Sequence, residues 1–192
     1  NRIARKADEI YDYSNDKFGI KLFFHTMVMV LLHPIDGFNK LKYQRDRYRW
    51  YHVLLLIFMI IFVRVTYIYL VHFPMADTLP QYTDFLQEVL TLFVPIGLWT
   101  IISYAITTIS DGKTKFKEAV ISVLFSFTPY IVLSLPLALL SQVLCSNESG
   151  MYNSLVIIVW IWSIVLVLLS TMQLNEYGFL QLVWNVIKIL FV

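Results

Sequence analysis

Long apolar runs separated by short polar stretches dominate the chain. A helix rises 1.5 Å per residue, so four of these runs are long enough to cross a hydrocarbon core about 30 Å thick. They predict spans at 52–73, 87–109, 119–144 and 154–174, and a shorter run predicts a fifth span at 179–192 that continues past the last residue. We therefore expect an all-α, polytopic membrane bundle of about five transmembrane helices, because backbone hydrogen bonds inside lipid must be satisfied within each span.

The N-terminal segment, residues 1–51, is polar and charged apart from one short apolar run, LFFHTMVMVLL at 22–32. As a helix this run is about 16 Å long, which is too short to cross the membrane. We interpret it as an interfacial helix on the membrane surface, with a re-entrant segment as the alternative. The chain then divides into this segment and a transmembrane bundle over 52–192.

Lys and Arg are unevenly placed, although the formal net charge is only +2. Ten lie in 1–51 and three in the turn at 110–118, whereas the loops at 74–86 and 145–153 hold none. The positive-inside rule places the N-terminus and the 110–118 turn in the cytoplasm. The sequence thus predicts a multi-pass protein of the cell membrane.

The two basic elements, 34–51 and 110–118, mix cationic with aromatic residues. Beside a span this pattern indicates contact with anionic lipid headgroups, at about 1 kcal/mol per cation, or with a docking partner; nucleic acid is not expected. The candidate docking or lipid-facing residues are Asp36, Gly37, Lys40, Lys42, Arg45, Arg47, Arg49, Asp111, Gly112, Lys113, Lys115 and Lys117. The runs DGFNKLK at 36–42 and DGKTKFK at 111–117 are alike, and each could begin a helix with its Asp near the N-terminus.

Arg64 is expected near the middle of the first span, where a charge costs about 2.5–3.5 kcal/mol on insertion scales. Its candidate partners are Glu88 and Asp84, toward the outer end, or a carbonyl that Pro129 releases in the third span. Three interpretations follow: Arg64 bridges helices and fixes their packing, it lines a transport or binding path, or it snorkels from a tilted helix.

The third span contains Pro129 and Pro136, seven residues apart and therefore on nearly one face, together with several hydroxyl residues such as Ser126. These residues predict a bent packing helix, or alternatively a hinge beside a small cavity. With Arg64 they are the intramembrane polar candidates.

The sequence offers no nucleophile with a partnered base, no phosphate loop and no metal-ligand spacing. The four His residues do not cluster, and the single cysteine, Cys145, allows neither an internal disulfide nor a Cys-based zinc site. We expect a protein that is not an enzyme and that binds no cofactor or metal.

Two segments resemble a known family: HPIDGFNKLKY at 33–43 and YAITTISDGKTKFKEAVISVLFSFTPYIV at 104–132. With the five-span layout they are similar to bacterial members of the Yip family, the Ypt-interacting proteins, over about residues 30–190. The resemblance favours a bacterial origin. It implies a non-enzymatic membrane scaffold or accessory subunit that docks another membrane protein complex, such as an ABC-type transporter, through its cytoplasmic face.

The alternative is a small transporter or permease component with a path near Arg64 and the Pro129 kink. Two departures from the family pattern limit what the resemblance implies. Similar bacterial sequences often have His-Glu-Tyr where this chain has Asn175-Glu176-Tyr177, and the Asp-Leu-Tyr-Gly-Pro motif of eukaryotic members is absent. Metal or proton chemistry at the first position, and binding of small GTPases, are therefore not expected.

Overall fold

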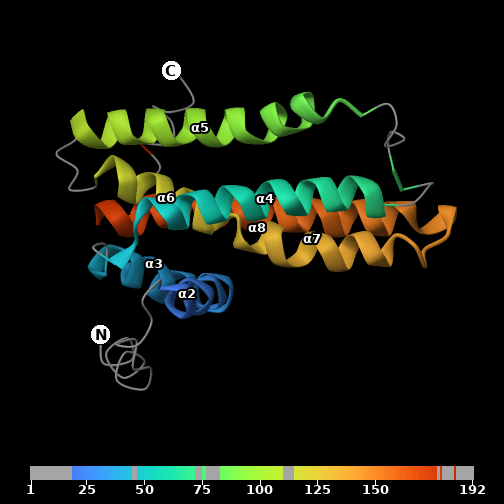
Figure 1. Ribbon diagram of the computed structural model, residues 1–192, viewed down its shortest axis with the longest axis horizontal. Coiled ribbons are helices and arrows are strands. Elements are labelled where there is room, and N and C mark those ends of the chain that lie inside the picture. The colour runs from blue at the N-terminus through green and yellow to red at the C-terminus, as the bar shows by residue number, and fades with distance from the viewer. Residues whose placement is uncertain are drawn as a thin grey trace.

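The computed structural model of the chain describes residues 19–44, 47–71, 75–76, 83–109, 115–176, 178 and 184. The regular structure in these ranges is helical, which confirms the predicted all-α fold. In chain order the elements are α2 (Ile20–Leu32), α3 (Pro34–Tyr43), α4 (Trp50–Leu70), α5 (Phe85–Ile109), α6 (Phe116–Ser126), α7 (Thr128–Leu140), the 3-10 helix η4 (Ser146–Glu148) and α8 (Ser149–Asn175) (Figure 1).

Four stretches are long and apolar enough to cross a membrane: α4, α5, α6 with α7, and η4 with α8. They correspond to the first four predicted spans. The fourth helix begins at Ser149, five residues earlier than predicted, and the third stretch ends at Leu140 rather than 144. The predicted fifth span, 179–192, lies outside the described residues apart from Trp184.

The third stretch is divided at Phe127, which separates α6 from α7. Pro129 is in the first turn of α7, where its missing N–H costs little, so the chain starts a new helix there instead of continuing the old one. Pro129 also cannot donate to the carbonyl of Phe125, four residues earlier. The Thr128 hydroxyl donates to that carbonyl at 2.6 Å instead. Pro136 lies inside α7, and the helix continues through it.

The centre of the bundle is formed by α8, which packs against α3, α6 and α7, and by α4, which packs against α6 and α7. Leu56, Ile60, Phe125 and Leu166 are fully buried where these helices meet. The opposite sides of α4 and α8 expose large apolar side chains, as expected for helices that face lipid. The core therefore depends on α4, α6, α7 and α8.

Helix α5 lies beside this core rather than within it (Figure 1). Near its C-terminal end, the small buried residues Thr100, Ser103 and Thr107 allow close approach to Ser122 of α6, as small residues do between membrane helices. Toward the N-terminal half of α5, the helices α5, α6 and α8 leave an apolar cavity of about 240 Å³ between them, and Pro95 is among the side chains that line it. Helix α5 thus packs closely on α6 near its C-terminal end. Beside its middle the packing leaves a cavity, although Leu92 and Ile96 are buried there.

Helix α2 crosses the long axis of the spans steeply, so that it is seen nearly end-on in Figure 1. One side is buried, with Phe23 and Val30 fully inaccessible, while the other exposes Phe24 and Val28. The exposed side is thus apolar, whereas a helix resting on a membrane surface usually presents a polar face to water. The outer side of α2 fits lipid chains, and its depth in the membrane stays a prediction.

Helix α3 folds back against α2 after the break at His33 and Pro34. Their backbones approach closely at Gly37: a Cβ atom there would lie 2.8 Å from Val30 Cγ2 and 2.9 Å from the Val30 backbone nitrogen. Only glycine fits this contact. Residues 20–43 therefore form a packed pair of helices, α2 and α3.

Candidate functional site

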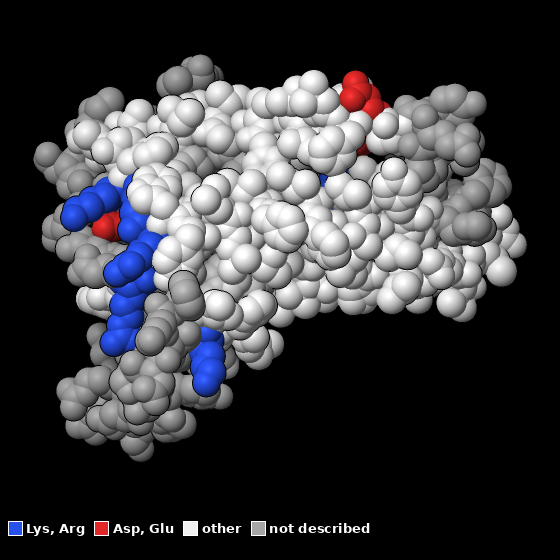
Figure 2. Space-filling model, viewed as in Figure 1, with Lys and Arg blue, Asp and Glu red and all other residues white. Residues whose placement is uncertain are grey.

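The described Lys and Arg residues other than Arg64 lie toward the end of the molecule where α3 lies and α4 and α6 begin (Figure 2). The long flank of the helices in this view is almost free of charge. Of the predicted docking residues, Arg47, Arg49 and Lys115 are exposed, and Asp36 and Lys117 are partly buried. Predicted residues Arg45, Asp111, Gly112 and Lys113 lie outside the described residues.

Gly37 and Lys40 do not belong to the exposed surface where the sequence placed them. Gly37 is packed against α2, and Lys40 is only 6% exposed, with its ammonium group 3.3 Å from His25 Nδ1. Both lie on the side of α3 that faces the protein. The predicted surface is therefore smaller than the sequence suggested, and these two residues position α3 instead.

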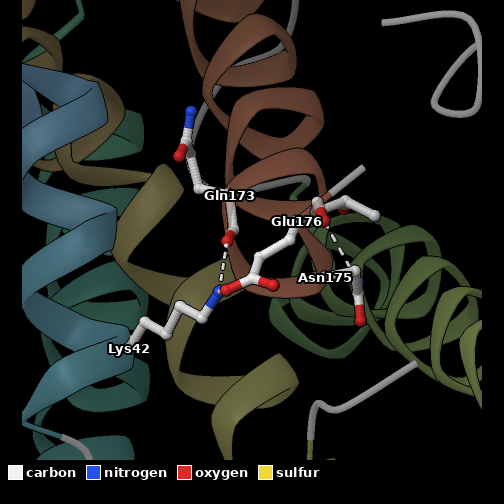
Figure 3. A network of polar contacts seen from close by, with 5 residues as sticks. Lys42, Gln173, Asn175 and Glu176 are labelled. Carbon is white, nitrogen blue, oxygen red and sulfur yellow. Dashed lines mark hydrogen bonds and ion pairs between the residues drawn. The ribbon is translucent and has the colours of Figure 1, made fainter. Parts of the chain in front are cut away.

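Lys42 connects α3 to the end of α8 (Figure 3). Its ammonium group lies 2.7 Å from Glu176 Oε1 and donates to the carbonyl of Gln173 at 3.4 Å. Glu176 adopts the left-handed conformation that commonly ends a helix, with φ of 58°. A cation at this position also interacts favourably with the negative end of the helix dipole.

The runs at 36–42 and 111–117 are not equivalent in structure. The first lies within α3, with Asp36 in the first turn. For the second, the helix begins only at Phe116, and the acidic residue of its first turn is Glu118, whose carboxylate accepts from the Lys115 backbone N–H at 3.3 Å. The lysines at the start of α6 therefore belong to a helix N-terminus, whereas Lys42 belongs to a helix C-terminal turn.

A small pocket with a volume of about 110 Å³ lies between the last turn of α3 and the start of α6. Its apolar lining includes Leu41, Ile121 and Leu174, and Tyr48 is buried beside them. The charged residues that line it are Lys42, Lys115, Lys117 and Glu118. The pocket thus joins α3, α6 and α8 at the basic end.

Within the membrane, Arg64 is paired with Glu88, one of the two acidic partners that the sequence suggested. Arg64 Nε donates to Glu88 Oε2 at 3.0 Å, and a second guanidinium nitrogen contacts the same oxygen. Arg64 is six residues, or about 9 Å of helix rise, from the end of α4 at Leu70. It is therefore nearer the end of the span than the sequence interpretation placed it, at the depth where α5 begins.

Tyrosine side chains surround this ion pair. The Arg64 guanidinium lies 6.0 Å from the centre of the Tyr67 ring, and the hydroxyls of Tyr67 and Tyr152 are 2.8 Å apart. Tyr130, which follows Pro129, is close enough to interact electrostatically with Arg64. The pair and the tyrosines form a polar layer that links α4, α5, α7 and α8.

The hydroxyl groups of the third span bond mainly to their own helix. Ser126 is fully buried and donates to the carbonyl of Ser122 at 2.8 Å, and Ser163 of α8 likewise donates to Val159 at 3.0 Å. The carbonyl released by Pro129 is occupied by Thr128, not by Arg64. Ser126, Pro129 and Pro136 therefore shape the helix, and the described contacts do not join them to Arg64 as one polar path.

The parts of the chain that the structure describes hold no group of three or more His, Cys, Asp or Glu residues that could bind a metal ion. What they do hold is a helical membrane bundle with one basic end and one ion pair between spans. These features define a polytopic α-helical membrane protein.

Comparison with known families gives a match to the Yip1 domain over residues 28–192. The chain therefore belongs to the Yip1 domain family, whose members are non-enzymatic membrane proteins. Searches of curated proteins and of solved structures gave no match. Membership of the Yip family is confirmed, whereas the bacterial type stays a prediction. The expectation that this is not an enzyme is confirmed by the family.

Several contacts of the site are invisible to sequence inspection. Lys42 and Glu176 are 134 residues apart. The hydroxyls of Thr26 in α2 and Tyr48, which precedes α4, are 2.7 Å apart across 22 residues of sequence. Neither pair belongs to a motif. Only Arg64 carried a signal, because an unpaired charge in an apolar run implies a partner.

Proposed function

We propose that this protein is a non-enzymatic membrane scaffold or accessory subunit that docks another membrane protein complex through its basic end. The observation that carries the proposal is the concentration of exposed cationic side chains at one end of an otherwise apolar bundle (Figure 2). Membership of a non-enzymatic family supports a binding role. An ABC-type transporter complex is the partner class that the family resemblance suggests.

The transporter alternative has less support. Arg64 is neutralised by Glu88 and surrounded by tyrosines, and the nearby serines are bonded within their own helices. An ion pair that links two helices fits a packing role better than a conduction path. We therefore place the function at the basic end rather than at Arg64.

The proposal requires the basic end to face the cytoplasm, as the positive-inside rule predicts. Cys145 tests this orientation because it is exposed and lies between α7 and η4, at the opposite end of the bundle from the start of α6. We expect a membrane-impermeant maleimide to label Cys145 in intact cells. Cys145 is the chain's single cysteine, so Cys145→Ser supplies the unlabelled control.

A matched variant reports the other end. In the Cys145→Ser background, Lys117→Cys introduces a cysteine at the start of α6, and we expect labelling only after the membrane is permeabilised. The reverse pattern, with the Lys117→Cys variant labelled in intact cells and Cys145 protected, would contradict the proposed orientation.

Docking itself is tested by affinity purification of the full chain from native membranes in mild detergent. We expect a defined partner complex to co-purify. Arg47→Glu with Arg49→Glu should reduce its recovery at least tenfold, because the reversed charges would face acidic groups of the partner, and like charges juxtaposed at an interface cost several kcal/mol. Both arginines are exposed, so the fold should be kept. Ser146→Glu with Asn147→Glu places the same number of acidic residues at the opposite exposed end as a control.

Reproducible purification of the protein alone, or equal loss of the partner in both double variants, would count against docking through the basic end.

A further inference from the structure

The pocket between α3, α6 and α8 has features that docking does not use. Its volume of about 110 Å³ is several times the ~10–15 Å³ that one water molecule requires. The space is sufficient for a tetrahedral phosphate group. It is also concave, whereas the exposed arginines of the docking surface, Arg47 and Arg49, are not part of its lining.

The charge of the lining favours an anion. Lys42 is already held by Glu176. The Glu118 carboxylate accepts a hydrogen bond from the Lys115 backbone N–H and keeps its negative charge, so it offsets one of the lysines that line the pocket. Lys115 and Lys117 remain, and among the residues that the structure describes neither ammonium group has an ion-pair partner. Lys115 and Lys117, which have no ion-pair partner in the described part of the chain, therefore line the pocket beside the N-terminus of α6, whose backbone also favours negative charge.

The position of the pocket indicates where such an anion comes from. It lies at the end of the bundle where α4 and α6 begin and α8 ends, which is the level of lipid headgroups if these apolar helices span the bilayer. Leu41, Ile121 and Leu174 line it together with the lysines, so that it offers both apolar and cationic surface. Basic pockets between transmembrane helices commonly hold phosphate headgroups.

We propose that this pocket is a binding site for the phosphate group of an anionic phospholipid, with Lys115 and Lys117 as the residues that bind it and Lys42 as a third, partly neutralised cation. The pocket lies within the same basic end as the docking surface, but Arg47 and Arg49 do not line it. Binding of the lipid does not require a protein partner.

The test is a titration of the purified full chain in detergent micelles with phosphatidylglycerol and, separately, with phosphatidylcholine, with bound lipid counted by native mass spectrometry. We expect tighter binding of phosphatidylglycerol than of phosphatidylcholine. Lys115→Gln with Lys117→Gln should weaken it roughly 30-fold, since each headgroup-facing cation contributes about 1 kcal/mol. Lys115→Arg with Lys117→Arg, which keeps both charges, should bind near wild-type affinity.

The matched control is Arg47→Gln with Arg49→Gln, which removes the same charge from the same end outside the pocket. We expect it to keep its bound lipid while losing the protein partner, and the Lys115 and Lys117 variant to show the opposite result. Unfolding midpoints of all variants establish that each is folded.

Three results would overturn the proposal. Equal loss of lipid from the Arg47→Gln, Arg49→Gln protein and the Lys115→Gln, Lys117→Gln protein would mean a diffuse attraction to the membrane rather than a pocket. Inorganic phosphate that binds as tightly as the lipid and displaces it would identify a site for free phosphate. Loss of the protein partner without loss of lipid in the Lys115 and Lys117 variant would assign the pocket to protein docking.

Discussion

Replacing Arg64 by Leu is expected to destabilise the folded protein by at most roughly 2.5–3.5 kcal/mol, because that is the cost of an uncompensated charge at the centre of a span and Glu88 lies nearer the end of one. The substitution leaves Glu88, whose side chain is only 25% exposed, without its cation. It also removes a link between α4 and α5, beside whose middle the packing already leaves a cavity. The loss is measured as a shift in the unfolding transition of the purified protein in mixed micelles.

A double-mutant cycle separates charge pairing from packing. Arg64→Leu with Glu88→Leu removes both charges, and we expect it to recover much of the stability, because no buried charge then lacks a partner. Transport by a reconstituted wild-type protein that disappears in a stably folded double variant would instead favour a path at Arg64. If the double variant instead loses as much stability as the two single variants together, the ion pair contributes nothing specific.

Replacing Gly37 by Ala is expected to loosen the α2–α3 pair. The added Cβ would lie under 3.0 Å from Val30 Cγ2 and the Val30 backbone nitrogen, and backbone cannot rotate away as a side chain can. Overpacking of this kind costs about 1–3 kcal/mol, which outweighs the gain of about 1 kcal/mol that Ala brings to a helix interior. Hydrogen exchange should then show reduced protection of α2 and α3, while α8 changes little.

Gly97→Ala is the matched control for this prediction. Gly97 also lies inside a helix, but no atom would come within 4 Å of its added Cβ. The substitution should be neutral or slightly stabilising by up to about 1 kcal/mol. Unchanged protection of α2 and α3 in the Gly37→Ala protein would show that these helices do not depend on the close contact with Val30.

The spans were predictable because the membrane imposes a local rule. An apolar run of sufficient length must be a helix, whatever it packs against, so α4, α5 and α8 could be located from hydropathy alone. The division at Phe127 was less accessible. Pro129 predicted a bend in the third span. It did not predict that α6 ends at Ser126 or that the Thr128 hydroxyl donates to the carbonyl of Phe125.

The packing of α2 and α3 was not predictable in the same way. Lys40 and Gly37 belong to a basic run that predicted a docking or lipid-facing surface, and the run at 22–32 predicted an interfacial helix. Lys40 is buried because its long apolar stem packs inward and its ammonium group meets His25, which no short motif encodes. Which side of a short helix faces the protein depends on contacts with α6 and α8, far away in sequence.

The ion pair between Arg64 and Glu88 also bears on how the protein is made. The two residues are 24 positions apart and belong to consecutive helices, so both are present once α5 has been synthesised, before α6, α7 and α8 exist. A hairpin of α4 and α5 can therefore enter the bilayer with its two charges already neutralised by each other. In this order of assembly, the later helices pack against a hairpin that is electrostatically complete, and the ion pair acts first as an aid to membrane insertion.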